Sequence, residues 1–214
     1  MTSINITASI IEAFILYILF FFPAYTGTPA FIPFSVYQEL FRVFVYKTPA
    51  FFLVFYLLNG KNLCNKSDIA PRQGLRFLLA FFAALPVLCL ISVCISTAAD
   101  FFSPSASSPV LEKPGSAIGW LVLSASCLAT GLLEETFFRV YLPKRLSDVT
   151  VAFGLPLLLS TALFAFSHLY EGPWGVANAF LSGLFLCLVF AKTKNLVGIA
   201  MAHGAYNFLV YAMS

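Results

Sequence analysis

The stretch that decides the fold is Leu75–Ala99, LRFLLAFFAALPVLCLISVCISTAA, in which Arg76 is the only charged residue. A helix that crosses a bilayer needs about 20 predominantly apolar residues. The whole chain shares this character, because 60% of its 214 residues are hydrophobic and 10% are charged. A typical soluble domain is about a quarter charged. The sequence therefore predicts a polytopic membrane protein and excludes a secreted globule, a disordered tail and a nucleic-acid binder.

Similar apolar segments recur along the chain. Because lipid offers the backbone no hydrogen-bond partners, helices are the expected spanning form. We predict an all-α transmembrane bundle of about seven spans. In the second span, Glu39 and Arg42 are predicted to pair, and Pro49 marks either a kink or a later helix start. The predicted spans are Ile4–Tyr25, Phe34–Leu58, Leu75–Ala99, Ser116–Leu142, Val151–Leu169, Trp174–Ala191 and Leu196–Met213.

The basic residues predict how the chain is oriented. Nine of the twelve Lys and Arg residues fall in or beside the connections after the second, fourth and sixth predicted spans. Cytoplasmic loops of membrane proteins carry the excess of Lys and Arg. We therefore expect a cytoplasmic N-terminus. The five cysteines form no CxxC pair, which argues against a disulfide framework or a zinc knuckle.

One segment carries two adjacent carboxylates. Glu135 and Arg139 are four residues apart, so they lie on one helix face and are predicted to form an ion pair. Glu134 points about 100° away from Glu135, so its carboxylate is free to face a cavity. A carboxylate in that position suits general-base catalysis. A salt-bridge cluster at the end of the helix is the alternative interpretation.

Both histidines of the chain lie in apolar runs. Phe164 and His168 are one helical turn apart, and so are His203 and Asn207, whose side chains can donate hydrogen bonds to an oxyanion. Ser167 is not predicted to be a nucleophile, because adjacent residues do not face each other on a helix. Hydrogen bonding between helices is the alternative for each histidine.

The depth of these groups is consistent with a shared site. Glu134 and His203 each lie eight residues, about 12 Å, from the predicted cytoplasmic ends of their helices. His168 would be about 25 Å deep if its helix began at Val151, but about 18 Å deep if it began near Pro156. A start near Pro156 would bring the polar groups into one layer open to the cytoplasm.

Three motifs follow one another in apolar segments: Glu134-Glu135-x-x-x-Arg139, Phe164-x-x-x-His168 and His203-x-x-x-Asn207. Their order resembles that of the CPBP family of intramembrane proteases, also called the Abi family, which includes the CAAX prenyl endopeptidases. The resemblance covers roughly residues 116–210. It divides the chain into a catalytic transmembrane core, 116–214, and N-terminal transmembrane helices, 1–115, without a recognised motif. It implies a peptidase whose site lies inside the bilayer. By similarity, Glu134 and His168 activate the attacking water, His203 and Asn207 stabilise the oxyanion, and Glu135, Arg139 and Phe164 support the site.

A metal is the main alternative for the mechanism. Two histidines and one glutamate with an open water position are a ligand set of catalytic zinc, and family members have been labelled metalloproteases on such grounds. However, the sequence has no HExxH motif, and asparagine is an unusual zinc ligand. We therefore expect glutamate-activated water attack without a cofactor, and rank zinc lower.

Two other functions stay open at this point. One is a non-catalytic bacteriocin-immunity or scaffold protein of the same fold, and the other is a small proton-coupled transporter. A transporter would show polar residues spread across several spans at the midplane of the membrane, or an inverted repeat, and neither is evident. The expected partners are the bilayer and a membrane-associated or lipidated peptide or protein. The expected location is a bacterial cytoplasmic membrane. No motif identifies the substrate or an oligomeric state.

Overall fold

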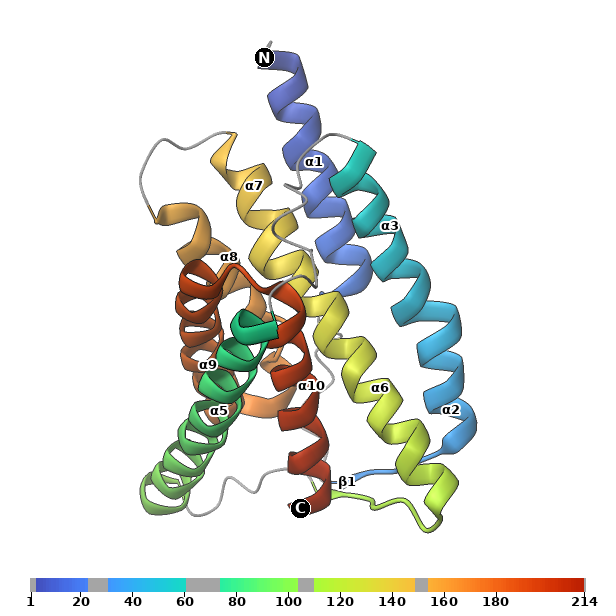
Figure 1. Cartoon of the computed structure of the whole chain (residues 1–214). Helices are drawn as coiled ribbons and strands as arrows, with labels where there is room; N and C mark the ends of the chain where they lie inside the picture. Colours follow the sequence, from blue (N-terminus) through green and yellow to red (C-terminus); the bar gives the residue numbers. More distant parts are fainter. Residues whose placement is uncertain (1–2, 23–30, 61–73, 104–109, 149–153, 214) are drawn as a thin grey trace.

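The computed structural model describes residues 3–22, 31–60, 74–103, 110–148 and 154–213, which are almost entirely helical (Figure 1). Two-residue strands β1 and β2 pair in parallel beside the bundle. The elements are α1 (Ser3–Phe20), β1 (Phe31–Ile32), α2 (Val36–Phe41), η1 (Arg42–Lys47), α3 (Thr48–Gly60), α5 (Gly74–Phe102), β2 (Val110–Leu111), α6 (Ala117–Glu135), η2 (Thr136–Tyr141), α7 (Leu142–Ser147), α8 (Leu155–Phe166), η3 (Leu169–Glu171), α9 (Gly172–Thr193) and α10 (Leu196–Met213).

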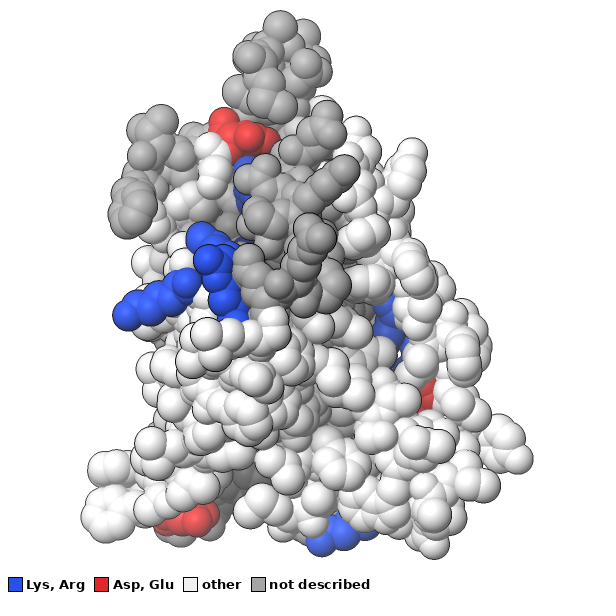
Figure 2. Space-filling model, viewed as in Figure 1, with Lys and Arg blue, Asp and Glu red and all other residues white. Residues whose placement is uncertain are grey.

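Among the described residues, five helices are long and apolar enough to cross a bilayer. The predicted all-α membrane bundle is therefore confirmed, while the number of spans and the side of the N-terminus stay predictions. Figure 2 shows a broad uncharged surface, with basic side chains gathered on the left near the upper end of α9 and other charged side chains near the top, near the bottom and on the flank formed by α2 and α3. The five helices are Val36–Gly60, Gly74–Phe102, Ala117–Ser147, Leu169–Thr193 and Leu196–Met213.

The predicted fifth span, Val151–Leu169, is too long. α8 begins directly after Gly154, whose φ of +82° favours glycine. This confirms the alternative start near Pro156; residues 151–153 lie outside the described part of the chain. The 12 residues of α8 rise about 18 Å. A single turn, η3, and Gly172 with φ +79° then lead into α9, so His168 lies between two helices and not inside one.

Two π-helical turns accommodate prolines within long helices. η1 ends just before Pro49, and η2 ends just before Pro143. Proline has no N–H, and its ring clashes with the carbonyl four residues earlier, so the preceding turn must widen. Val36–Gly60 is continuous through this turn, and the alternative helix start at Pro49 is therefore wrong.

The N-terminal helix α1 is tied to α7 by a polar contact. Glu12 Oε1 accepts hydrogen bonds from Tyr141 Oη at 2.6 Å and from Arg145 Nη2 at 2.7 Å. Arg145 is almost completely buried. These charges inside the bundle therefore hold two helices together.

A second polar cluster ties η1 to α6. Lys47 Nζ donates to Ser126 Oγ at 2.7 Å, and Ser126 Oγ donates to Glu39 Oε2 at 2.5 Å. Arg42 Nη1 lies 2.6 Å from Glu39 Oε1, which confirms the predicted pair. The ionisable residues of the second span therefore satisfy one another.

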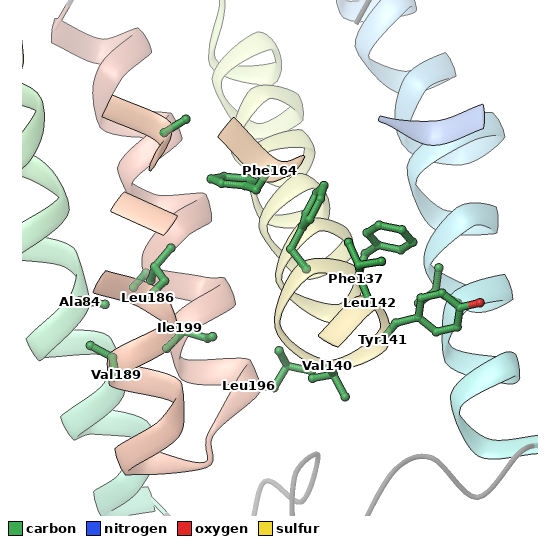
Figure 3. Close-up of a cluster of buried hydrophobic side chains, with 14 of the residues drawn as sticks. Ala84, Phe137, Val140, Tyr141, Leu142, Phe164, Leu186, Val189, Leu196 and Ile199 are labelled. Carbon is green, nitrogen blue, oxygen red and sulfur yellow. The ribbon is translucent and has the colours of Figure 1, made fainter. Parts of the chain in front are cut away.

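Close packing of α6 against α10 depends on two glycines. A Cβ at Gly131 would lie 2.4 Å from the carbonyl oxygen of Ala200, and a Cβ at Gly204 would lie 2.8 Å from the Cα of Leu128. Both contacts are with backbone atoms, so only glycine permits this approach. Figure 3 shows the neighbouring apolar core, with Phe164 beside the η2 aromatic rings.

Gly131→Ala should therefore push α10 away from α6. We expect a loss of stability of about 1–3 kcal/mol, the usual cost of overpacking, together with reduced activity. Thermal unfolding of the purified protein in detergent measures the first effect. Gly74→Ala is the matched control, because a Cβ at Gly74 meets nothing within 4 Å. Equal melting temperatures for the two variants would contradict the packing argument.

Candidate active site

Glu135 is the centre of a buried ionic network. Arg139 Nε donates to Glu135 Oε2 at 2.8 Å, and both side chains are completely buried. This confirms the predicted ion pair. On the other side, His203 Nδ1 lies 2.9 Å from Glu135 Oε1. A carboxylate can only accept a hydrogen bond, so Nδ1 carries the proton. Glu135 therefore joins α6 to α10.

Glu134 lies on the other side of the same histidine. Its Oε2 atom is 3.7 Å from His203 Nε2, which is too long for a hydrogen bond. This oxygen is buried, and it has no hydrogen-bond partner among the described residues. The two adjacent carboxylates are thus held differently, as their helical spacing predicts. Glu135 is fully engaged, whereas Glu134 keeps a free acceptor.

His168 is oriented by the end of α8. Its Nδ1 lies 2.9 Å from the carbonyl oxygen of Phe164, so this nitrogen is the protonated one. Nε2 then carries the free lone pair. The carbonyl of Phe164 also accepts a hydrogen bond from Ser167 Oγ at 2.6 Å. The backbone thus selects the tautomer of His168.

Ser167 does approach His168, contrary to prediction. Its Oγ is 3.2 Å from Nδ1 of His168. Only the premise that these adjacent residues do not face each other was wrong, because it assumed a continuous helix, whereas the backbone leaves the helical conformation at His168. Nδ1 is nevertheless protonated and cannot accept the proton of Ser167. The geometry therefore does not make Ser167 a nucleophile.

Glu134 and His168 share one cavity of about 210 Å³. α6 supplies Glu134, whereas His168 comes from the connection between α8 and α9. Most of the other lining residues are aromatic, and none of them was among the predicted site residues. The run of three phenylalanines at the end of the first span was a signal for them. The cavity is lined by Phe20, Phe21, Phe22, Glu134, Ser167, His168 and Tyr170.

The ring of Phe164 packs between the site groups. Its centroid is 4.7 Å from that of His168 and 6.0 Å from that of His203. The guanidinium carbon of Arg139 lies over the face of the Phe164 ring, 4.9 Å from the ring centroid. The Phe164 ring therefore lies in contact with both histidine rings and helps to hold them in position. Asn207 is half-buried one turn beyond His203, and no hydrogen bond joins it to the other described site residues.

The donor set does not fit zinc. Within the part of the chain that the structure describes, no three His, Cys, Asp or Glu side chains lie where they could share a metal ion. His203 Nδ1 and Glu135 are already bonded to each other. The mechanism below therefore uses the side chains alone.

A helical membrane bundle with a buried carboxylate and two imidazoles has the groups of an intramembrane hydrolase. Residues 116–209 match the family model of the type II CAAX prenyl endopeptidase Rce1-like domain, which contains every motif residue predicted above. Residues 116–209 thus form a domain that matches the Rce1-like family, which confirms the predicted resemblance to the CAAX prenyl endopeptidases. No curated protein and no solved structure matches the chain.

Proposed function

We propose that this protein is an intramembrane endopeptidase that hydrolyses peptide bonds of membrane-associated or lipidated substrates by glutamate-activated water attack. The observation that carries the proposal is the cavity that Glu134 and His168 line together. No hydrogen bond to a described residue holds the buried Oε2 atom of Glu134. The match of residues 116–209 to a peptidase family supports the same reaction class.

In this mechanism a water molecule in the cavity donates hydrogen bonds to the Glu134 carboxylate and to His168 Nε2. The water oxygen attacks the carbonyl carbon of the scissile bond while one of its protons passes to Glu134. The C–N bond of the tetrahedral intermediate then breaks. The proton held by Glu134 moves to the leaving nitrogen, which restores the carboxylate and releases an amine and a carboxylic acid.

We assign to His203 and Asn207 the role of stabilising the oxyanion of the tetrahedral intermediate. With Nδ1 bonded to Glu135, His203 can donate from Nε2 only as the doubly protonated ring, and the two flanking carboxylates stabilise that form. The Asn207 amide lies one turn further along α10 and would supply the second donor. Both groups come from the helix that Glu135 holds in place.

His203→Ala should lower kcat more than it raises KM. Removing one oxyanion donor costs about 10²–10³-fold in kcat. His203→Gln should recover part of the loss, because an amide can still donate. Steady-state kinetics of the folded variants measures the changes in kcat and in KM separately. An increase in KM alone would assign His203 to substrate binding and contradict the oxyanion role.

The site needs no cofactor in this proposal, and its partners are the bilayer and the substrate. We place the protein in a bacterial cytoplasmic membrane with the site open to the cytoplasm. The basic residues support this orientation. Lys144 lies on α7, Lys192 in the last turn of α9, and Lys194 directly after it. These ends of α7 and α9 face away from the C-terminus of the chain (Figure 1).

Reconstitution into liposomes tests the proposed function. The purified protein is incubated with lipidated and unlipidated versions of the same membrane-anchored peptides, and the products are identified by mass spectrometry. New peptide termini that depend on the protein support an endopeptidase. Intact peptides beside a folded protein, across a broad sequence library, would favour the immunity or scaffold function.

A further inference from the structure

The candidate cavity is walled by a part of the chain outside the matched peptidase domain. Phe20 is the last residue of α1, and Phe21 and Phe22 follow it directly, more than ninety residues before residue 116. They line the same cavity as Glu134 and His168. The N-terminal helix therefore contributes directly to the space in which the reaction would take place.

Contacts with the core fix the middle residue of this wall. The ring of Phe21 lies 4.5 Å from that of Phe137 and 4.8 Å from that of Phe138. Both of these residues belong to η2, which follows Glu134 and Glu135 directly, and both are completely buried. The position of α1 is thus tied to the turn after the two carboxylates.

The two outer residues of the wall are also held. Tyr46 donates a hydrogen bond to the carbonyl oxygen of Phe20, and their rings are 5.9 Å apart. The ring of Phe22 lies 6.1 Å from that of Phe166 at the end of α8. One turn earlier on α1, Tyr17 donates to the carbonyl oxygen of Leu163 at 3.0 Å. The wall is therefore preformed, which favours selectivity.

We propose that Phe20, Phe21 and Phe22 form the pocket for a substrate side chain and select a large uncharged apolar residue beside the scissile bond. This inference rests on the proposed function, because Glu134 and His168 would place the scissile carbonyl at the cavity. Size supports it: an apolar cavity of about 150 Å³ accommodates benzene. About 210 Å³ therefore holds one aromatic or branched aliphatic side chain, and not a long lipid chain in addition.

The charges in the cavity argue against an ionised side chain. An acidic side chain would be repelled by Glu134, the carboxylate in the cavity wall. A basic side chain would pair with Glu134 and occupy the oxygen needed as the base. An apolar side chain instead buries its surface against three phenylalanine rings and leaves Glu134 free.

Cleavage of peptides that differ only at the residue beside the scissile bond tests the selectivity. The wild type should prefer Leu or Phe over Ala, Asp and Lys. Phe22→Ala, which removes an exposed ring, should shift the preference toward Trp about tenfold, the lower end of what pocket-size changes achieve. Phe14→Ala is the matched control, since Phe14 is an exposed residue of α1 that does not line the cavity.

The outcomes separate this inference from the proposed function. Glu134-dependent cleavage with the same preference in Phe22→Ala, Phe20→Ala and the wild type would overturn the assignment of the wall and leave the protease intact. Absence of Glu134-dependent cleavage would overturn the proposed function. In that case a second measurement tests the inference. It probes the chemical character of the cavity and does not depend on catalytic activity.

That measurement uses Ser167→Cys in a background without the five native cysteines. Ser167 lines the cavity, so the introduced thiol reports what enters it. Benzyl methanethiosulfonate should react at least tenfold faster, relative to a free thiol, than small charged methanethiosulfonates. Adding Phe22→Ala should admit naphthyl-sized reagents. Equal rates for apolar and charged reagents, or no effect of Phe22→Ala, would overturn the inference.

Discussion

Glu134→Gln is expected to abolish peptide hydrolysis while the helical bundle stays folded. A general base contributes about 10²–10⁴-fold to the rate, and glutamine cannot take up the proton of the attacking water. Because Oε2 of Glu134 has no hydrogen-bond partner among the described residues and lies 3.7 Å from His203, its replacement by an amide breaks no hydrogen bond at that atom. Initial rates in liposomes, at matched amounts of protein, measure the loss.

Glu112→Gln is the matched control for this prediction. Its carboxylate accepts a hydrogen bond from the backbone of Phe34 at 2.9 Å, near the paired strands and away from the cavity. This variant should cleave like the wild type, and both variants should melt within a few degrees of it. Full activity of Glu134→Gln would remove Glu134 from the role of the base.

Glu135→Gln, unlike Glu134→Gln, should cause a large loss of stability. Glu135 and Arg139 are both completely buried, and Glu135 also bonds His203. Removing one partner of a buried ion pair costs about 3–5 kcal/mol, because the other charge stays buried without compensation. We expect a clearly lower melting temperature in detergent, whereas Glu134→Gln leaves it nearly unchanged.

A second substitution tests the cause of that loss. Arg139→Gln alone should also destabilise the protein, but the double variant should lose less than the sum of the two single losses. The shortfall measures the coupling between the two side chains. If the two losses simply add, or if Glu135→Gln melts like the wild type, the buried pair does not hold α6 in place.

Local spacing predicted the features that depend on one helix. The apolar runs marked the helical segments, and the spacing of four residues identified the pair Glu135–Arg139. Helical geometry also predicted that Glu134 points away from the face that carries Glu135 and Arg139. Each of these inferences needs only helical geometry, which a single segment of sequence contains.

Other features depend on how the chain turns and packs. His168 was expected inside a helix, because apolarity alone does not show that the chain leaves the helix before η3 and Gly172. Nothing in the local pattern of His203 indicated its bond to Glu135, 68 residues away. The same holds for the wall from Phe20 to Phe22, which reaches the site only through the packing of α1.

If Glu134 is the general base, peptide hydrolysis in the membrane depends on its carboxylate. The most direct measurement compares peptide termini, by mass spectrometry, in membranes of cells that carry the wild type or Glu134→Gln at matched protein levels. We predict a set of termini that is present with the wild type and absent with the variant. Identical termini in the two membranes, with both proteins folded and the liposome substrates also uncut, would contradict the claim.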